Sequence, residues 1–209
     1  MKIGYYTAIF GRSGSGKNVL LKNLLYHEYE RFDHYLIFDA DSDYNNCKDY
    51  DYLSHNPNVT IHANVESFMA DVDKLSSFQE QTVADGNDVK LCIIMDNIFG
   101  KLDLKKDTRL KELFTSGRKK NIFCILLLQN MNELISGIVR ASLSHVYMVS
   151  KLDTGSNDNL YSLSKYDTKK EFVQGINSIS TELNNRKYLD LKKRKLIPYN
   201  ILQYHLHVT

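Results

Sequence analysis

The sequence contains little that would divide the chain, cross-link it or direct it out of the cell. Its only prolines are Pro57 and Pro198, and no proline-rich linker, internal repeat or low-complexity tract separates parts of the 209 residues. Its three cysteines form no CxxC pair, and Cys92 and Cys124 lie inside apolar runs, where cysteine behaves as a small hydrophobe. We therefore expect one globular unit in a reducing compartment.

Charge and long apolar runs are also scarce. The 27 basic and 25 acidic side chains leave a net charge of only +2, so any surface for nucleic acid must be a local one. The longest apolar run, residues 122–128, is far shorter than the roughly 20 residues that span a bilayer, and the N-terminal segment lacks the pattern of a signal peptide. The expectation is a cytoplasmic protein without a membrane span.

Short apolar runs alternate with segments of helical spacing. The runs are residues 4–10, 35–38, 59–62, 90–95, 122–128 and 145–149, and helical periodicity marks residues 65–75 and 110–114. This alternation predicts an α/β fold with a mostly parallel central sheet flanked by helices, and we expect five parallel strands at its core. Residues 1–150 form the predicted core. Residues 151–209 form an extension packed on it, with a helix at 169–184 and strands at 187–191 and 201–207.

A glycine-rich loop follows the first predicted strand and precedes a helix. Its residues are Gly11, Arg12, Ser13, Gly14, Ser15, Gly16 and Lys17. Such a loop points backbone N–H groups at an anion, the helix N-terminus adds partial positive charge, and Lys17 neutralises the outer phosphates. We therefore predict ATP and Mg²⁺ as cofactors. Asn18 stands where serine or threonine normally offers a hydroxyl to Mg²⁺, and its amide oxygen is a weaker ligand.

Two further apolar runs end in polar side chains. Asp96 follows one run and is the predicted Mg²⁺-holding carboxylate, whereas the next residue, Asn97, stands where many such ATPases carry the glutamate that activates water. Either another group helps, such as Asp103 or a residue of a neighbouring subunit, or hydrolysis is slow. Gln129 follows the other run and is a candidate γ-phosphate sensor, unless it merely caps its strand.

Other acidic and basic motifs carry weaker alternatives. The loop that begins at Asp39 is not an EF-hand, because Tyr44 and Tyr50 replace the turn glycine and the bidentate glutamate, although Asp39 itself is expected near the site. Residues 150–153, Ser-Lys-Leu-Asp, are similar to a guanine-recognition motif, but the spacing from Asp96 to Gly100 differs from that of GTPases. Basic residues 118–120 and 192–195 are either solvated faces or contacts to nucleic-acid phosphates.

The order of these motifs resembles the FtsK/HerA superfamily, and within it the genome-packaging ATPases of large DNA viruses, virophages and related transposons. The resemblance covers about residues 5–149 and rests on three segments: residues 10–17, residues 92–96, and residues 116–122 running into 127–130. It implies a RecA-like P-loop NTPase with an additional strand between the P-loop and Asp96 strands. Gln129 matches the sensor glutamine of the family.

The resemblance also implies a function and its partners. The family members are ring-forming motors that use ATP to drive double-stranded DNA into a capsid, so the implied partners are duplex DNA, further copies of the chain and a capsid protein, in a virus factory or virion. Arg118 matches the family's arginine, and we hypothesise that it reaches the γ-phosphate of a neighbouring subunit. Asn18 and Asn97 keep a second class open, a nucleotide-gated binding or scaffold subunit with little hydrolysis.

Overall fold

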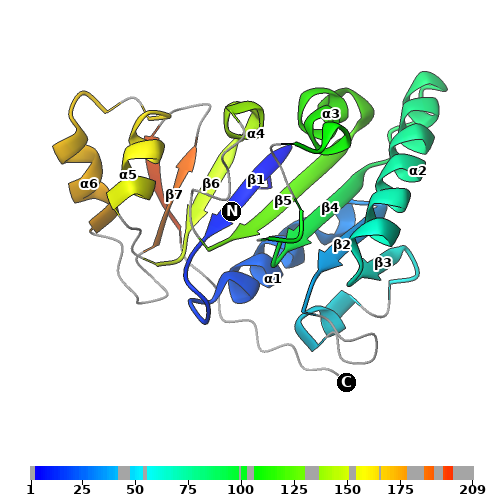
Figure 1. The fold of residues 1–209 in the computed structure, drawn as a ribbon, viewed down its shortest axis with the longest axis horizontal. Coiled ribbons are helices and arrows are strands. Elements are labelled where there is room, and N and C mark those ends of the chain that lie inside the picture. Colours follow the sequence, from blue (N-terminus) through cyan, green and yellow to red (C-terminus); the bar gives the residue numbers. More distant parts are fainter. Residues whose placement is uncertain are drawn as a thin grey trace.

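Eight strands form one sheet at the centre of the molecule (Figure 1). The computed structural model describes residues 3–41, 48–53, 56–98, 100–102, 106–129, 137–150, 154–164, 166–177, 186–190 and 195–199. The strands are β1 Tyr6–Phe10, β2 His34–Asp39, β3 Val59–His62, β4 Leu91–Asp96, β5 Ile122–Leu128, β6 His145–Met148, β7 Arg186–Asp190 and β8 Lys195–Tyr199. The α-helices are α1 Lys17–Glu28, α2 Val65–Ala84, α3 Thr108–Ser116, α4 Gly137–Ser142, α5 Thr154–Tyr161 and α6 Lys169–Asn177. Short 3₁₀ segments are η1 Tyr29–Arg31, η2 Lys48–Leu53 and η3 Gly117–Lys120.

The strand order is β3-β2-β4-β5-β1-β6-β7-β8. The first six strands of this order pair in parallel. Strands β7 and β8 extend the sheet beyond β6 as antiparallel strands. The expectation of five parallel strands was therefore wrong by one, because the run that became β6 also joins the parallel set. Strand β5 lies between β1 and β4, which confirms the additional-strand P-loop architecture.

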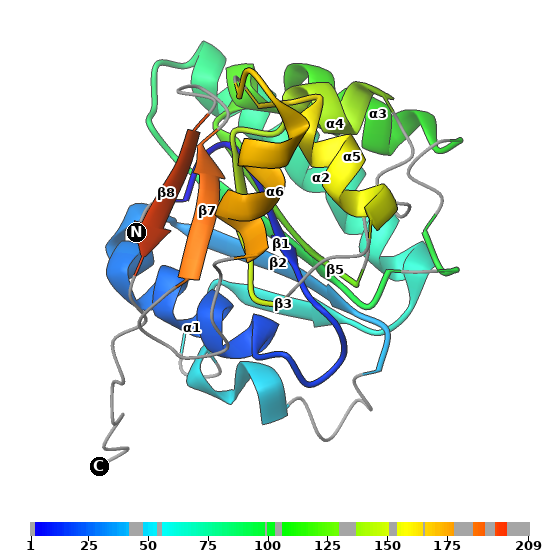
Figure 2. The same ribbon diagram turned by 90° about the vertical axis from the view of Figure 1, so that its left-hand side faces the viewer.

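Helices cover both faces of the sheet (Figures 1 and 2). Side chains of α2 to α6 pack on one face, whereas α1 and η2 pack on the other. Alternate residues of one strand enter opposite layers: in β5, Leu126 belongs to the first core and Leu127 to the second. Strands buried on both faces explain the continuous apolar runs in the sequence.

The helices begin where side chains can cap them. Asn64 accepts hydrogen bonds from the first backbone N–H groups of α2, and Asp107 does the same for α3. Both helices were predicted, as were α6 and β7. The sequence did not predict α4, α5 or β8, and the predicted strand at 201–207 lies outside the described residues.

The C-terminal elements share the core of the N-terminal ones. Leu160, Phe172, Ile176 and Leu189 are fully buried in the same cluster as β1, β4 and β5. A division at residue 150 stays a prediction. Among the described residues, no helix combines the length and the apolar character that crossing a bilayer requires.

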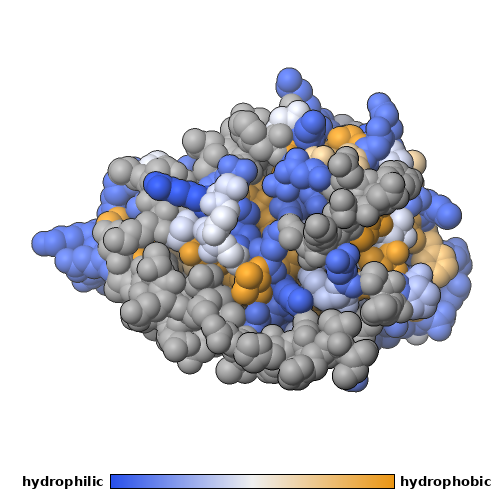
Figure 3. All heavy atoms as spheres, turned by 90° about the horizontal axis from the view of Figure 1, so that it is seen from below, coloured by the Kyte–Doolittle hydropathy of each residue, from blue (hydrophilic) through white to orange (hydrophobic). Residues whose placement is uncertain are grey.

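The face seen from below Figure 1, on the side of α1, is mixed in character. Figure 3 shows hydrophobic side chains there as small separate groups between hydrophilic ones, in the part of this face that is described. Val19 and Tyr26 of α1 are the exposed large hydrophobic side chains of that helix, 52% and 50% exposed.

Candidate functional site

The phosphate-binding loop predicted from the sequence connects the buried end of β1 to the first residue of α1, Lys17. Gly14 and Gly16 have φ angles of 69° and 91°, a region that favours glycine. A Cβ atom on Gly11 would lie 2.3 Å from both Ser15 Oγ and Val149 Cγ2. Two of these glycines are therefore required by conformation and the third by close packing.

Polar contacts give the loop a defined shape. Ser15 N donates to Arg12 O at 3.1 Å, Gly11 N donates to Leu128 O at 3.1 Å, and Arg12 N donates to Ser150 Oγ at 3.2 Å. The Lys17 ammonium donates to Gly11 O at 2.9 Å and to Arg12 O at 3.3 Å, so its charge lies over the loop. Among the described residues, buried Ser15 Oγ has no hydrogen-bond partner, which is a polar atom that a phosphate oxygen could satisfy.

Two carboxylates lie side by side beyond β2 and β4. Asp39 and Asp96 end these neighbouring strands and are register partners, and they are only 6% and 2% exposed. Tyr50 Oη donates to Asp96 Oδ2 at 3.1 Å, and the backbone N of Asn97 donates to Asp96 Oδ1 at 2.9 Å. The side-chain amide of Asn97 donates to Asp39 Oδ1 at 3.3 Å. The four residues form one connected polar cluster.

Burial dominates the electrostatics of this cluster. It raises the pKa of Asp96 from 3.8 to about 6, and the neighbouring Asp39 carboxylate adds to the rise. The hydrogen bonds from Tyr50 and Asn97 and the charge of Lys17 act in the opposite direction. Burial and the nearby Asp96 also raise the pKa of Tyr50 well above 10.0, so its hydroxyl stays protonated as a donor.

The donor set suits a magnesium ion. Mg²⁺ is usually held by one or two carboxylates, with phosphates and waters as its other ligands. Asp96 and Asp39 supply two buried carboxylates that repel each other, and a divalent cation would relieve that repulsion. Asn18 is the second residue of α1 and is partly buried beside the loop.

Asn97 has a conformational reason to be asparagine. Its φ angle is 50°, in the left-handed region that asparagine tolerates better than glutamate does. An amide at this position cannot accept a proton, and here it holds Asp39 instead. The sequence predicts Asp39 near the site. It does not predict the hydrogen bond from Tyr50 to Asp96, because no local pattern links residues 50 and 96.

Gln129 and Arg118 lie at opposite ends of β5. Leu128 pairs with Phe10, so exposed Gln129 follows β5 at the edge of the sheet where the phosphate loop lies. Arg118 lies in η3, before β5 begins, with its guanidinium 5.0 Å from the Tyr5 ring centroid at the other edge. The structure therefore brings Lys17, Asp96 and Gln129 to one edge and leaves Arg118 out of its own subunit's site. Asp103 and residues 151–153 lie outside the described residues.

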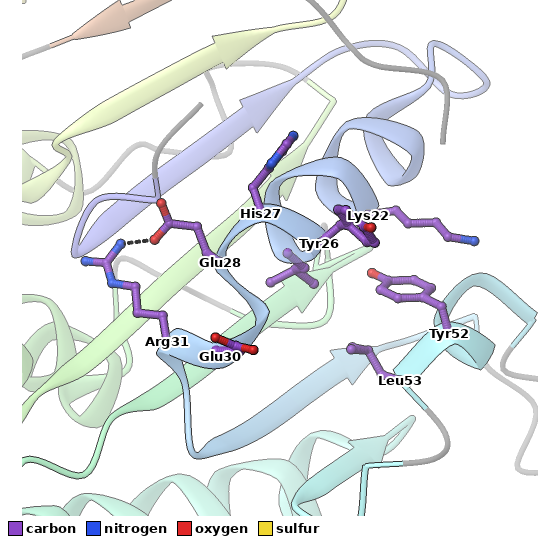
Figure 4. A pocket seen from close by; sticks show the side chains of 9 residues that line it. Lys22, Tyr26, His27, Glu28, Glu30, Arg31, Tyr52 and Leu53 are labelled. Atoms are coloured by element: carbon purple, nitrogen blue, oxygen red, sulfur yellow. Dashed lines mark hydrogen bonds and ion pairs between the residues drawn. The ribbon is translucent and has the colours of Figure 1, made fainter. Parts of the chain in front are cut away.

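A separate hollow of about 890 Å³ lies at the far end of α1 (Figure 4). Lys22 and Tyr26 of α1, Glu28, Glu30 and Tyr52 are among the side chains that line it. Glu28 forms an ion pair with Arg31 across its rim. Its lining balances Glu28 and Glu30 against Lys22 and Arg31, so the hollow lacks the excess of positive charge that the phosphates of a nucleotide require.

Comparisons with solved structures place the fold among P-loop ATPases. The chain is similar to the genome packaging NTPase B204 from Sulfolobus turreted icosahedral virus 2 in complex with ATP-gammaS, with a TM-score of 0.67 and 14% identity over 94% of this chain and 97% of that chain. It is also similar to EssC (ATPases 2 and 3) from Geobacillus thermodenitrificans, with a TM-score of 0.66 and 14% identity over 96% of this chain and 40% of that one. At these identities the likeness shows the fold alone.

The same fold occurs in the cytoplasmic domain of the Thermomonospora curvata type VII secretion ATPase EccC, with a TM-score of 0.61 and 13% identity over 90% of this chain and 24% of that chain. A search of curated proteins found no similar sequence. These neighbours share the fold that the resemblance to the FtsK/HerA superfamily implies. The sequence family of the poxvirus A32 protein matches residues 1–194, and the chain belongs to that family.

Proposed function

We propose that the protein is an ATPase that drives double-stranded DNA into a viral capsid, as a ring of identical subunits. The observation that carries the proposal is the sheet order, which puts the phosphate loop, Asp96 and Gln129 at one edge of a chain of the A32 family. The similarity to an NTPase described as genome packaging supports the biological setting. A capsid protein is the further partner that this setting requires.

Each residue at this edge has a role in the proposal. The loop amides and Lys17 bind the phosphates of ATP, Asp96 and Asn18 hold Mg²⁺, and Gln129 contacts the γ-phosphate. The bound ion would supply neutralisation of charge that develops on the transferred phosphate. Asp39 lies next to Asp96 and is held by Asn97, and its carboxylate is the described candidate for positioning a water molecule.

Arg118 has a role only between subunits. It lies at the edge of the sheet opposite the phosphate loop, so it can reach a γ-phosphate only in a neighbouring copy. In this proposal the active site is completed by assembly, and hydrolysis rises with protein concentration.

A nucleotide-gated scaffold is the second candidate function. It is favoured by one observation, the amide side chains at Asn18 and Asn97, where a hydroxyl and a carboxylate would speed turnover. A scaffold subunit would bind ATP and change partners without measurable hydrolysis. A GTPase is disfavoured because β5 lies between β1 and β4, which separates this architecture from most GTPases.

The deciding experiment measures Mg²⁺-dependent ATP hydrolysis with and without duplex DNA, over a series of protein concentrations. Turnover that rises with both DNA and protein concentration supports the packaging motor. Tight ATP binding without turnover under all conditions makes the scaffold the better description. Preference for GTP over ATP in a competition assay would contradict both.

The matched control is Lys17→Ala, which removes the charge over the loop. It is expected to lose ATP binding in a fluorescent-nucleotide assay while unfolding at about the same temperature as the parent protein, since Lys17 is only partly buried. Retained ATP affinity in this variant would refute the phosphate-loop assignment.

A further inference from the structure

A groove of about 660 Å³ opens at the edge of the sheet opposite the phosphate loop. The start of β1, the segment η3 and the ends of α4 and α5 surround it. Its polar lining includes Tyr5, Arg118, Arg140, Ser142, His145 and Ser162, and no aspartate or glutamate is among its described lining residues. The groove therefore combines two guanidinium groups with no acidic side chain.

Arg118 is held in a fixed position on this rim. Its guanidinium lies 5.0 Å from the centre of the Tyr5 ring, and that ring stacks on Phe123 with centroids 4.3 Å apart. The backbone N of Arg118 donates to Tyr6 Oη at 2.9 Å. A guanidinium stacked on an aromatic ring keeps its in-plane N–H groups available for an anion.

Arg140 approaches the groove from α4. Its Nη1 donates to Asn159 Oδ1 at 3.2 Å, a neutral partner that leaves its charge uncompensated. In the described part of the chain, neither Arg118 nor Arg140 forms an ion pair with a carboxylate, and exposed Lys119 also has none. Lys120, by contrast, is paired with Glu80 at 2.8 Å and with Glu112 at 3.5 Å.

Two serine hydroxyls of the groove are already engaged as donors. Ser142 Oγ donates to Ile138 O at 2.8 Å, and Ser162 Oγ donates to Asn159 O at 2.7 Å, so both hydroxyl protons point away from a ligand. Asp190, the register partner of His145 in β7, is 6% exposed and is not part of the lining. The two arginines are therefore the permanently charged donors that the groove offers to an anion.

We propose that this groove binds the phosphate backbone of duplex DNA through Arg118 and Arg140, with the exposed neighbouring residue Lys119 adding attraction. This role of Arg118 is an alternative to its contact with the γ-phosphate of a neighbouring subunit, because one guanidinium cannot make both contacts at once. The proposal rests on the proposed packaging function and names the surface that holds its substrate. Arginine pairs in a bidentate manner with phosphate oxygens, and such contacts hold a duplex without reading its sequence. Backbone binding of this kind suits a protein that must accept every sequence of a genome.

The experiment compares the affinity for a short fluorescent DNA duplex in the presence of ATP, over salt concentrations from about 0.05 to 0.2 M. The variants are Arg140→Gln and Lys119→Gln, alone and combined, and the matched control is Arg109→Gln. Arg109 of α3 is exposed, as Lys119 is, but it is paired with Asp107 and with Asp73 of α2 and lies outside the groove. Lys119→Gln changes an exposed side chain only, so it keeps the test valid should Arg140→Gln fold poorly.

The double variant is expected to bind about tenfold more weakly at 0.1 M salt, and each lost charge should reduce the slope of log K against log salt by about one. The control should keep the parent slope.

Equal binding by parent, double variant and control would overturn the groove assignment and leave the packaging function standing. Failure of the parent protein to bind DNA at all would refute the packaging function itself. A double variant that keeps DNA affinity but loses concentration-dependent hydrolysis would assign the groove to a neighbouring subunit and overturn the DNA proposal.

Discussion

The buried carboxylate of Asp96, the predicted Mg²⁺ ligand, lowers the stability of the folded protein when it is ionised. Its pKa is raised from 3.8 to about 6 in the folded protein, so the folded state resists its ionisation. Stability from the protonated form is present below about pH 4 and is lost as the pH rises through about 6. Above that pH the ionised side chain costs about 3 kcal/mol, which a cation beside it would offset.

Asp96→Asn is therefore expected to stabilise the protein in metal-free buffer at pH 7.5, by up to about 3 kcal/mol. The amide can still accept a hydrogen bond from Asn97 N and can face the Tyr50 hydroxyl. The measurement is the urea midpoint of parent and variant between pH 4 and pH 8 with a chelator present. The advantage of the variant should shrink toward pH 4, and a difference that stays constant with pH would contradict the assignment.

The effect of a substitution at Asn97 on stability should depend on the backbone conformation that the new residue tolerates, and not on the polarity of its side chain. Because its φ angle is 50°, Asn97→Glu is expected to lose about 1–2 kcal/mol of stability through left-handed strain, whereas Asn97→Gly should lose little. Thermal unfolding of both variants provides the measurement. Asn87→Glu, at an exposed position with an ordinary φ angle, is the matched control and should unfold at the parent temperature.

Among the elements, the turn from α3 into β5 depends on one hydroxyl. Tyr6 of β1 donates to Leu113 O at 3.0 Å and accepts from Arg118 N at 2.9 Å. It thereby fixes the end of α3 and the start of η3, which carries Arg118. Burial raises the pKa of Tyr6 to about 12, so the hydroxyl keeps its proton at neutral pH.

Tyr6→Phe keeps the ring but leaves both backbone groups without their partner. We expect a loss of about 1–3 kcal/mol in the free energy of unfolding, measured by urea denaturation. Tyr26→Phe, an exposed tyrosine on α1, is the control and should change stability by about 0.5 kcal/mol or less. A Tyr6→Phe protein as stable as its control would show that water replaces the hydroxyl.

The sequence predicts those elements whose own residues decide their structure. Strands such as β4 and β5 are buried on both faces, so their apolar runs are unmistakable. Helix α5 was missed because it is short and polar, with Leu160 as the only fully buried side chain among those described in it. Strand β8 was missed because Pro198 is atypical of a strand. The contact between Tyr50 and Asp96 could not be predicted, since it depends on how η2 folds back over the sheet.

At the scale of the whole molecule, one core joins the N-terminal and C-terminal halves. Strand β7 pairs with β6, and Phe172 and Ile176 of α6 are fully buried against the shared layer. Residues 1–150 alone would expose the edge of β6 together with that apolar surface.

A fragment of residues 1–150 is therefore expected to aggregate, or to lose cooperative unfolding, although it holds every predicted catalytic residue. Circular dichroism and gel filtration of the fragment, with the full chain as the control, provide the measurement. A monomeric fragment that unfolds cooperatively and binds ATP would show that residues 1–150 are a domain in their own right.

The position of β1 in the sheet has a consequence for how the protein is made. Its neighbours in the sheet are β5 and β6, which are synthesised much later. Tyr6 can pair only after Cys124 has left the ribosome, and Thr7 can pair with β6 only after His145 has left it. At about 5–20 residues per second, the first strand stays unpaired for several seconds. During that interval the apolar strand can form non-native contacts, and the phosphate-binding loop that follows it has not yet reached its folded shape. Nascent chains of this protein should therefore gain nucleotide binding only late in synthesis, long after the residues that make the contact have been translated.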